Sequence, residues 1–190
     1  PVFWFKSGPV VFVGIDTEVS DDHGQAVLDD MERILSKTDG LWRIVFLHRP
    51  IYSRGRHGSD ERGWNAALVP LFDRHRVDLV IAGHDHNYER FCRQTGLGTQ
   101  RRCRDGVGTV YVVSGGAATF TTPFPGLSRA GTPASRAQDT DMSRAFSNAH
   151  HYLIIDASST KLTMSAHRSM VGNLRGASIF DTLNLRRTDD

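Results

Sequence analysis

The fold is decided by the stretch GHDHNYER at residues 83–90 and by the apolar run VDLVIA at residues 77–82 that leads into it. The apolar run is short and rich in β-branched residues, which is typical of a buried strand in a parallel sheet. His84 and His86 therefore follow the carboxyl end of a strand, where open α/β sheets place their ligand sites. Imidazole suits zinc, iron and copper, but two histidines cannot fill a tetrahedral site alone. The sequence therefore predicts that further ligands come from elsewhere.

Two earlier runs have the same character as residues 77–82, namely VVFVGID at 10–16 and WRIVFL at 42–47. Between them, residues 25–37 carry apolar side chains at helical spacing, which predicts a helix packed on a core. A second helix is expected over residues 64–76, with a break at or near Pro70. The order strand, helix, strand, helix, strand with short connections predicts a parallel α/β sheet.

The pattern changes after residue 90. A strand is expected at 109–114, and residues 152–156, 161–167 and 178–185 predict three further strands joined by turns, in antiparallel order. Residues 117–148 are rich in Ala, Ser, Thr, Pro and Gly and predict a long loop, which in a compact domain is typical of a lid or of disorder.

Length and composition set limits on the class of protein. The chain has 190 residues, 39% of them hydrophobic and 23% charged, as in an ordinary single globular domain. The net charge of +2 is too small for a nucleic-acid-binding footprint, and the apolar runs are of strand length, so neither nucleic acid nor a membrane is expected as a partner.

The two cysteines, Cys92 and Cys103, flank a polar excursion between two strand-like runs. Their pairing in a local disulfide is favoured over a pair of free thiols, and it would place the protein outside the cytoplasm, secreted or otherwise extracytoplasmic. A zinc ribbon is disfavoured because it needs twice as many cysteines at closer spacing.

A third histidine, His48, also stands at the end of a predicted strand. One histidine at a strand end is usually a hydrogen-bonded loop residue, whereas His48, His84 and His86 together suggest a metal centre. The Gly-His-X-His form of the last two suggests two bridged ions, which in such sites clamp a phosphoryl group during in-line displacement.

At this point the residues resemble a known family. The block GHDHNYER resembles the Gly-His-X-His-X-Tyr-Glu-Arg block of the purple acid phosphatases, within the calcineurin-like metallophosphoesterases, and LHRPIYS at 47–53 is similar to their preceding metal-histidine block. The resemblance covers most of the chain outside residues 117–148. It implies an α/β fold in which a layered β-sandwich is flanked by helices, with a βαβαβ unit followed by antiparallel strands.

The resemblance also implies a chemistry and a set of roles. The expected activity is hydrolysis of phosphate monoesters by a metal-bound hydroxide at a dinuclear centre of Fe with Zn, Mn or Fe. His48 and His84 would ligate the divalent metal and His86 the ferric one. His57 falls where plant-type members carry a substrate-binding or proton-donating histidine, the alternative being an exposed loop histidine. Tyr88 and Arg90 are expected to support the site by packing rather than to catalyse.

The chain departs from the family pattern in one large respect. The first half of the domain, which supplies the carboxylate, tyrosine and asparagine ligands, has no counterpart here, so residues 1–190 resemble its C-terminal half. We expect the N-terminal half of the same domain as a partner and, where it is missing, an unpaired apolar edge among the strands at 10–16, 42–47 and 77–82. The alternatives are a phosphodiesterase or nucleotide phosphatase of the same superfamily, a non-catalytic fragment that binds a metal, and a module that binds a partner strand.

Overall fold

The computed structural model describes residues 2–18, 24–59, 63–117, 133–169 and 178–187. The strands are β1 (Val2–Ser7), β2 (Val10–Ile15), β3 (Trp42–Leu47), β4 (Leu79–Ala82), β5 (Tyr88–Phe91), β6 (Gln94–Thr95), β7 (Arg102–Cys103), β8 (Val110–Ser114), β9 (Ser143–Ser147), β10 (His151–Ala157), β11 (Lys161–Arg168) and β12 (Ile179–Arg186). The helices are α1 (Gly24–Leu35), α2 (Asn65–Arg74), the short 3-10 helix η2 (Gly98–Gln100) and α3 (Pro133–Met142).

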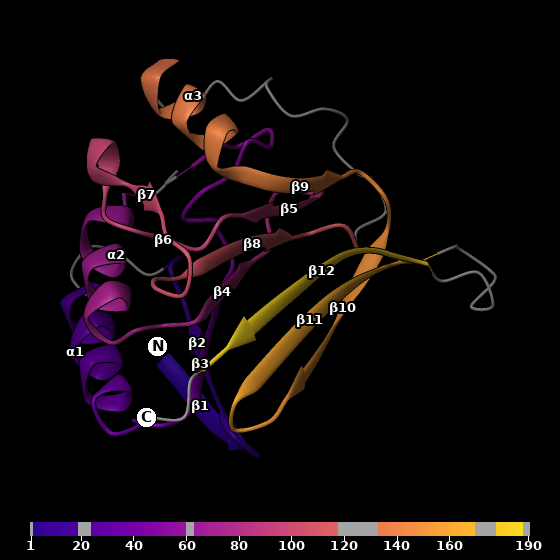
Figure 1. The fold of residues 1–190 in the computed structure, drawn as a ribbon. Helices are drawn as coiled ribbons and strands as arrows, with labels where there is room; N and C mark the ends of the chain where they lie inside the picture. The colour runs from indigo at the N-terminus through magenta and orange to yellow at the C-terminus, as the bar shows by residue number, and fades with distance from the viewer. Residues whose placement is uncertain (1, 19–23, 60–62, 118–132, 170–177, 188–190) are drawn as a thin grey trace.

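The main sheet has seven strands in the order β1-β2-β3-β4-β8-β5-β9 (Figure 1). Strands β2, β3, β4 and β8 run parallel, while β1, β5 and β9 pair antiparallel with their neighbours. The helices α1 and α2 connect β2 to β3 and β3 to β4, which confirms the predicted βαβαβ order.

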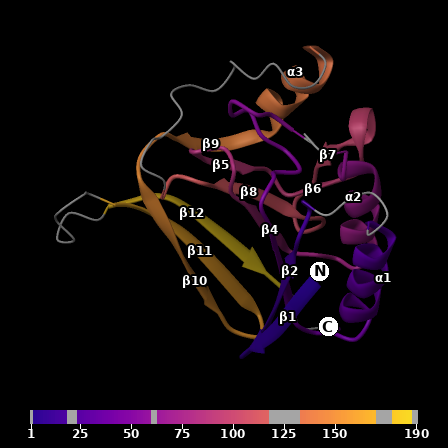
Figure 2. The same cartoon turned by 180° about the vertical axis from the view of Figure 1, so that it is seen from behind.

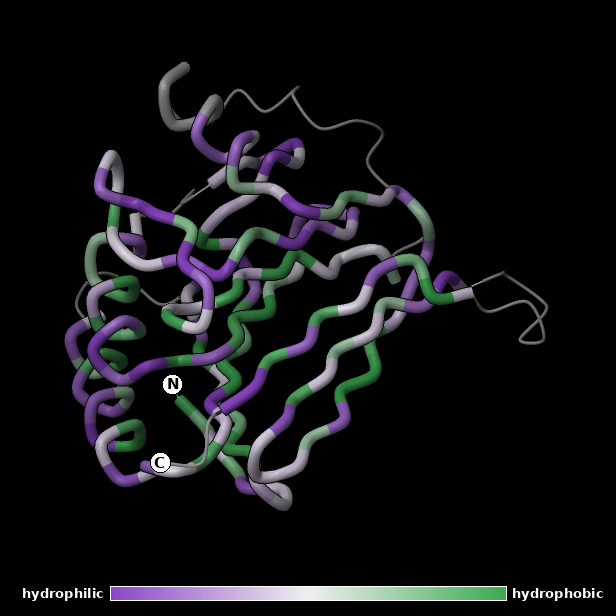
Figure 3. Tube along the Cα trace, in the orientation of Figure 1, coloured by the Kyte–Doolittle hydropathy of each residue, from purple (hydrophilic) through white to green (hydrophobic). Residues whose placement is uncertain are grey.

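Two layers pack on this sheet, one on each face. Helices α1 and α2 cover one face, and the antiparallel sheet β10-β11-β12 covers part of the other, as Figures 1 and 2 show from opposite sides. On the helix side, Met31 and Phe72 are fully buried against strand residues such as Val45. On the other side, Trp42 and Met164 are fully buried between the sheets. Apolar residues gather along the central strands that both layers cover (Figure 3), and the predicted sandwich flanked by helices is confirmed.

The predicted break at Pro70 is wrong, because α2 continues through this residue. Proline removes one backbone hydrogen bond from a helix interior. Here Leu68, Val69, Leu71 and Phe72 on both sides of it are buried, and this packing holds the helix together.

The predicted loop over 117–148 is wrong in its second half; residues 118–132 lie outside the described residues. Residues 133–142 form α3 and residues 143–147 form β9, which pairs with β5 through Arg90 and Ala145, among others. Neither segment has an apolar period in its sequence. The strand forms because β5 offers it a partner edge.

The sheet edge also differs from the prediction. Strand β1 pairs with β2 in full register, so β2 is not an edge strand. The open edge is β1 itself, where Phe3, Trp4 and Phe5 are each about half exposed. No helix in the described parts of the chain is long and apolar enough to cross a membrane.

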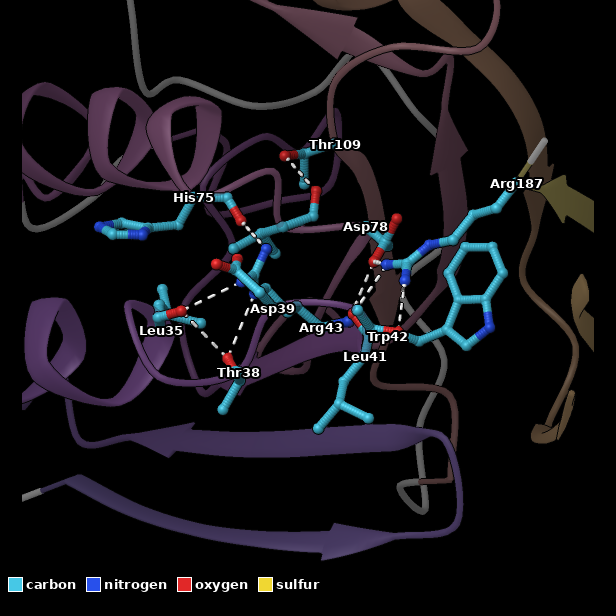
Figure 4. A network of polar contacts seen from close by, with 12 residues as sticks. Leu35, Thr38, Asp39, Leu41, Trp42, Arg43, His75, Asp78, Thr109 and Arg187 are labelled. Atoms are coloured by element: carbon cyan, nitrogen blue, oxygen red, sulfur yellow. Dashed lines mark hydrogen bonds and ion pairs between the residues drawn. The ribbon is translucent and has the colours of Figure 1, made fainter. Parts of the chain in front are cut away.

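A polar network ties the chain together at the amino end of the parallel strands (Figure 4). Buried Arg43 donates to the carbonyl oxygens of Leu35 and His75, and the Arg43 backbone N–H donates to Asp78. Arg187, near the end of the chain, donates to the same Asp78 carboxylate and lies over the Trp42 ring. Burial raises the pKa of Asp78, and its hydrogen bonds to Arg43 and Arg187 oppose that rise. This network lies at the opposite ends of the strands from the histidines, so it belongs to the framework.

Candidate metal centre

Strands β3 and β4 deliver two histidines to one point. The two strands are parallel neighbours in which Leu47 pairs with Ala82, so His48 and Gly83 each directly follow this last pair. The Gly83 N–H donates to the His48 carbonyl oxygen at 3.0 Å. The carboxyl ends of the strands are thereby fixed side by side, as the sequence predicts.

The imidazoles of His48 and His84 face each other. Nε2 of His48 lies 3.1 Å from Nδ1 of His84, and the ring centroids are 4.9 Å apart. Two nitrogens bound to one tetrahedral zinc at roughly 2.0–2.1 Å would lie about 3.4 Å apart. The pair therefore fits two ligand positions of a single ion.

His84 adopts a backbone conformation that is uncommon for a residue with a side chain, with φ at 62°. Such conformations persist where the surroundings fix them, and they gather at functional sites. Arg49 contributes here, with Nη1 3.1 Å from Nε2 of His84, and Glu18 binds the Arg49 guanidinium at 2.5 and 3.3 Å. Sequence reasoning missed Arg49, because nothing in the sequence places residue 49 against residue 84.

His57 joins the same cluster from the loop that follows β3. Its ring centroid lies 4.0 Å from that of His84, with the two planes inclined at 45°. The side chain is half-buried. The structure thus brings together His48, His57 and His84.

His86 lies in the same turn as His84 and is half-buried, but among the described residues no hydrogen bond or ring pair joins it to His48, His57 or His84. Among the described residues, no group of three or more His, Cys, Asp or Glu side chains is placed to hold a metal ion. These residues alone provide two converging ligands and one separate histidine. A complete dinuclear site requires more ligands than they offer.

Asp85 lies between the two histidines and is fully buried. Its carboxylate accepts hydrogen bonds from the Ser53 hydroxyl at 2.5 Å and from the His57 backbone N–H at 2.9 Å. This role could not be predicted from the sequence, because Asp85 fills the variable position of the Gly-His-X-His block. Its effect depends on a loop that folds over it.

The Tyr-Glu-Arg part of the block lies on β5, which pairs with β8 in the main sheet. The Tyr88 hydroxyl and the Arg90 guanidinium both donate to Asp181 on β12, and burial together with this carboxylate raises the pKa of Tyr88 well above its usual range. Glu89 points to the other side of the sheet, where the Arg54 backbone N–H and the Ser143 hydroxyl donate to it. The side-chain hydrogen bonds of Tyr88 and Arg90 that the structure describes thus go to Asp181 and not to His48, His84 or His86.

Cys92 and Cys103 are joined in a disulfide, as expected. His151, at the start of β10, is buried, and its Nε2 lies 3.0 Å from the Ser114 hydroxyl at the end of β8.

Comparisons with known proteins agree with this geometry. The family model described as "Calcineurin-like phosphoesterase" matches residues 4–88, which include His48, His84 and His86. Probable inactive purple acid phosphatase 27 of Arabidopsis thaliana is 32% identical over 145 residues, covering 66% of this chain and 23% of the relative. A nucleotide pyrophosphatase/phosphodiesterase of Hordeum vulgare is 30% identical over 143 residues, covering 65% of this chain and 39% of the relative.

A structural comparison extends the match over nearly the whole chain. The purple acid phosphatase PPD1 from yellow lupin (Lupinus luteus) seeds superposes with a TM-score of 0.71 at 19% identity, covering 98% of this chain and 32% of the lupin chain. The chain thus spans well under half the length of each of these relatives. The family match over residues 4–88, the sequence similarity and the shared fold show that this chain resembles the calcineurin-like phosphoesterases and that purple acid phosphatases are among the proteins it is similar to.

Proposed function

We propose that this chain is the histidine-bearing part of a metal-dependent phosphatase that hydrolyses phosphate monoesters. The observation that carries the proposal is the approach of His48 Nε2 and His84 Nδ1 to 3.1 Å at the carboxyl ends of adjacent parallel strands. The two strand ends lie within the matched phosphoesterase region, whose family uses divalent metal ions.

The proposed ligand roles follow from this geometry. His48 and His84 would hold one ion, and His86 would hold the second, with Fe paired with Zn, Mn or Fe as the proposed metals. When bound, the metals would activate the attacking water and neutralise charge on the phosphate oxygens. The chain's own part is to hold the imidazoles in place, which the strand pairing and the Gly83 hydrogen bond accomplish.

We assign His57 the role of donating a proton to the oxygen of the departing alcohol. Its ring lies 4.0 Å from that of His84, so a phosphate ester bound at the metals would lie within its reach. Arg49, held by Glu18 beside His84, adds positive charge to the same place.

The remaining ligands would come from the preceding half of the domain in the parent polypeptide. This proposal is supported by the small share of each relative that the chain covers, and by the exposed aromatic residues along β1. The disulfide supports an extracytoplasmic location, secretion included.

The test is metal analysis and phosphatase assay of the parent protein and its His84→Ala variant. The variant should bind less metal and lose more than about 100-fold in turnover, since even residues behind the ligands cost 10- to 100-fold. Full turnover with the metal still bound would overturn the ligand assignment. A wild-type protein with neither metal nor activity would instead favour the non-catalytic alternative.

A second candidate is hydrolysis of phosphodiesters or nucleotides, favoured by the similarity to the barley nucleotide pyrophosphatase/phosphodiesterase. The same ligands would serve both reactions. Comparing kcat/KM for a phenyl phosphate and for the corresponding diester separates the two, and a preference for the diester would replace the first proposal.

A further inference from the structure

Three carboxylates on three different elements accept hydrogen bonds from the loop 53–59, which carries His57. Asp85 in the turn after β4 accepts from Ser53 and His57, and Glu89 on β5 accepts from the Arg54 backbone N–H at 2.8 Å. Asp139 on α3 accepts from the Ser59 hydroxyl at 2.5 Å.

All three carboxylates are buried, at 0%, 0% and 3% exposure for Asp85, Glu89 and Asp139. A buried carboxylate is costly unless hydrogen bonds satisfy it, so each of them holds its donors firmly. The loop is therefore fixed along its whole length, although it has no helix or strand of its own.

Of the three, only Asp85 connects the loop directly to the metal-binding turn. It stands between His84 and His86, and its Oδ1 accepts the backbone N–H of His57 itself. The Ser53 hydroxyl that donates to Oδ2 of Asp85 also accepts the Gly55 N–H at 2.9 Å. One carboxylate thus sets the distance between the His84 turn and the His57 backbone.

The loop is also shaped to fit this carboxylate. A Cβ built at Gly55 would come within 2.5 Å of Oδ2 of Asp85, closer than real side chains approach one another. Only glycine permits the loop to lie so close over Asp85. Asp85 therefore provides the acceptor, and Gly55, which has no side chain, provides the space for the loop to reach it.

We propose that Asp85 is a positioning residue, which holds His57 against His84 so that its imidazole can protonate the leaving alcohol. The inference rests on the proposed phosphatase function. Without the Asp85 hydrogen bonds, the loop would keep the hydrogen bonds of Arg54 to Glu89 and of Ser59 to Asp139, but the backbone of His57 would no longer be bound to the turn that carries His84. A displacement of this kind, of about 1 Å, can cost on the order of 100-fold in rate.

The test is a double-mutant cycle in the parent protein, using Asp85→Ala, His57→Ala and the double variant. Each is assayed with an alkyl phosphate, whose leaving group needs a proton, and with 4-nitrophenyl phosphate, whose leaving group needs one far less. We expect Asp85→Ala to lower kcat on the alkyl ester by about 10- to 100-fold and on the nitrophenyl ester by much less. In the double variant the loss should equal that of His57→Ala alone, because Asp85 acts through His57.

Gly55→Ala gives an independent check that leaves every carboxylate in place, and it serves if Asp85→Ala does not fold. It should show the same dependence on the leaving group, because the added methyl group pushes the loop off Asp85. The control is Asp181→Asn, which removes a carboxylate bound by Tyr88 and Arg90 away from the loop. It should leave the leaving-group dependence unchanged.

The outcomes separate this inference from the proposed function. Losses that multiply in the double variant, or that are equal on both esters, would overturn the positioning role while the phosphatase function stands. A wild-type protein that hydrolyses neither ester would overturn the proposed function and, with it, the role of Asp85.

Discussion

At the scale of single residues, Glu89 is a buried carboxyl group whose charge changes near neutral pH. Its side chain is fully buried, and burial raises its pKa from 4.5 to about 7, against the hydrogen bonds from Arg54 and Ser143 that lower it. The folded protein therefore binds a proton at Glu89 between about pH 4.5 and pH 7, where the unfolded chain does not.

This difference predicts how stability depends on pH. Because Glu89 keeps its proton in the folded state in this window, its contribution to the free energy of unfolding should fall by up to about 3 kcal/mol as pH rises from about 5 to 8. Glu89→Gln carries no titrating group, so it should flatten this slope. Urea unfolding at four pH values measures the slope for each variant. Asp105→Asn, at an exposed position on the loop before β8, is the control that should keep the wild-type slope, and an unchanged slope in Glu89→Gln would contradict the prediction.

The residue-level prediction from sequence succeeded where the signal was local. His48 and His84 follow apolar runs, so their meeting at a sheet edge could be expected from the strand pattern alone. Asp85 and Arg49 gave no such signal, because their partners lie 28 to 35 positions away and are brought near only by the folded loop and the paired strands.

At the scale of elements, the disulfide fastens a segment that has little regular structure. Cys92 follows β5 and Cys103 lies in β7, and the bond spans a sequence separation of 11 that includes the two-residue strand β6 and the short helix η2. The bond adds a covalent constraint to the hydrogen bonds of this segment.

Reduction should therefore lower stability without dismantling the sheet. For a loop of this length the expected cost is about 3 kcal/mol. Guanidinium unfolding with and without a reductant measures it, and the Cys92→Ser/Cys103→Ser variant should match the reduced wild type in either buffer. A variant as stable as the oxidised protein would show that the bond does not contribute.

Some elements can be recognised from the apolar period of their sequence, whereas others form only through contacts in the folded protein. The helices α1 and α2 and the central strands have clear apolar periods, and their order along the chain was predicted correctly. Residues 133–147 have no apolar period. They form α3 and β9 because β5 provides a partner edge and because Asp139 binds Arg101 and Ser59. The helix α2 likewise continues through Pro70, because the side chains on either side of this residue are buried.

At the scale of the whole molecule, the two sheets are open on the same side. Strand β1 ends the large sheet and β10 ends the small one, and a pocket between them is lined by residues of both sheets: Ser7, Gly8, Pro9, Val10, Phe12, Ile155 and Ala157. Beside it, Phe5 stacks on Phe12 at 4.9 Å and Phe3 packs edge-on against Phe46 at 5.2 Å. Exposed aromatic residues on an unpaired edge strand normally need a cover.

We expect the preceding half of the parent polypeptide to provide this cover. In the parent protein, amide hydrogens of β1 should then exchange as slowly as those of β2, whereas an open edge would exchange quickly. Phe5→Lys should lower the free energy of unfolding of the parent by about 2–3 kcal/mol, because it places a charge where an aromatic ring is buried. Val107→Lys is the matched control, since Val107 is 60% exposed on the loop before β8 and its replacement should change stability by no more than about 0.5 kcal/mol. Fast exchange along β1, together with equal effects of the two substitutions, would mean that this side of the molecule stays open to solvent and that the missing ligands are held elsewhere.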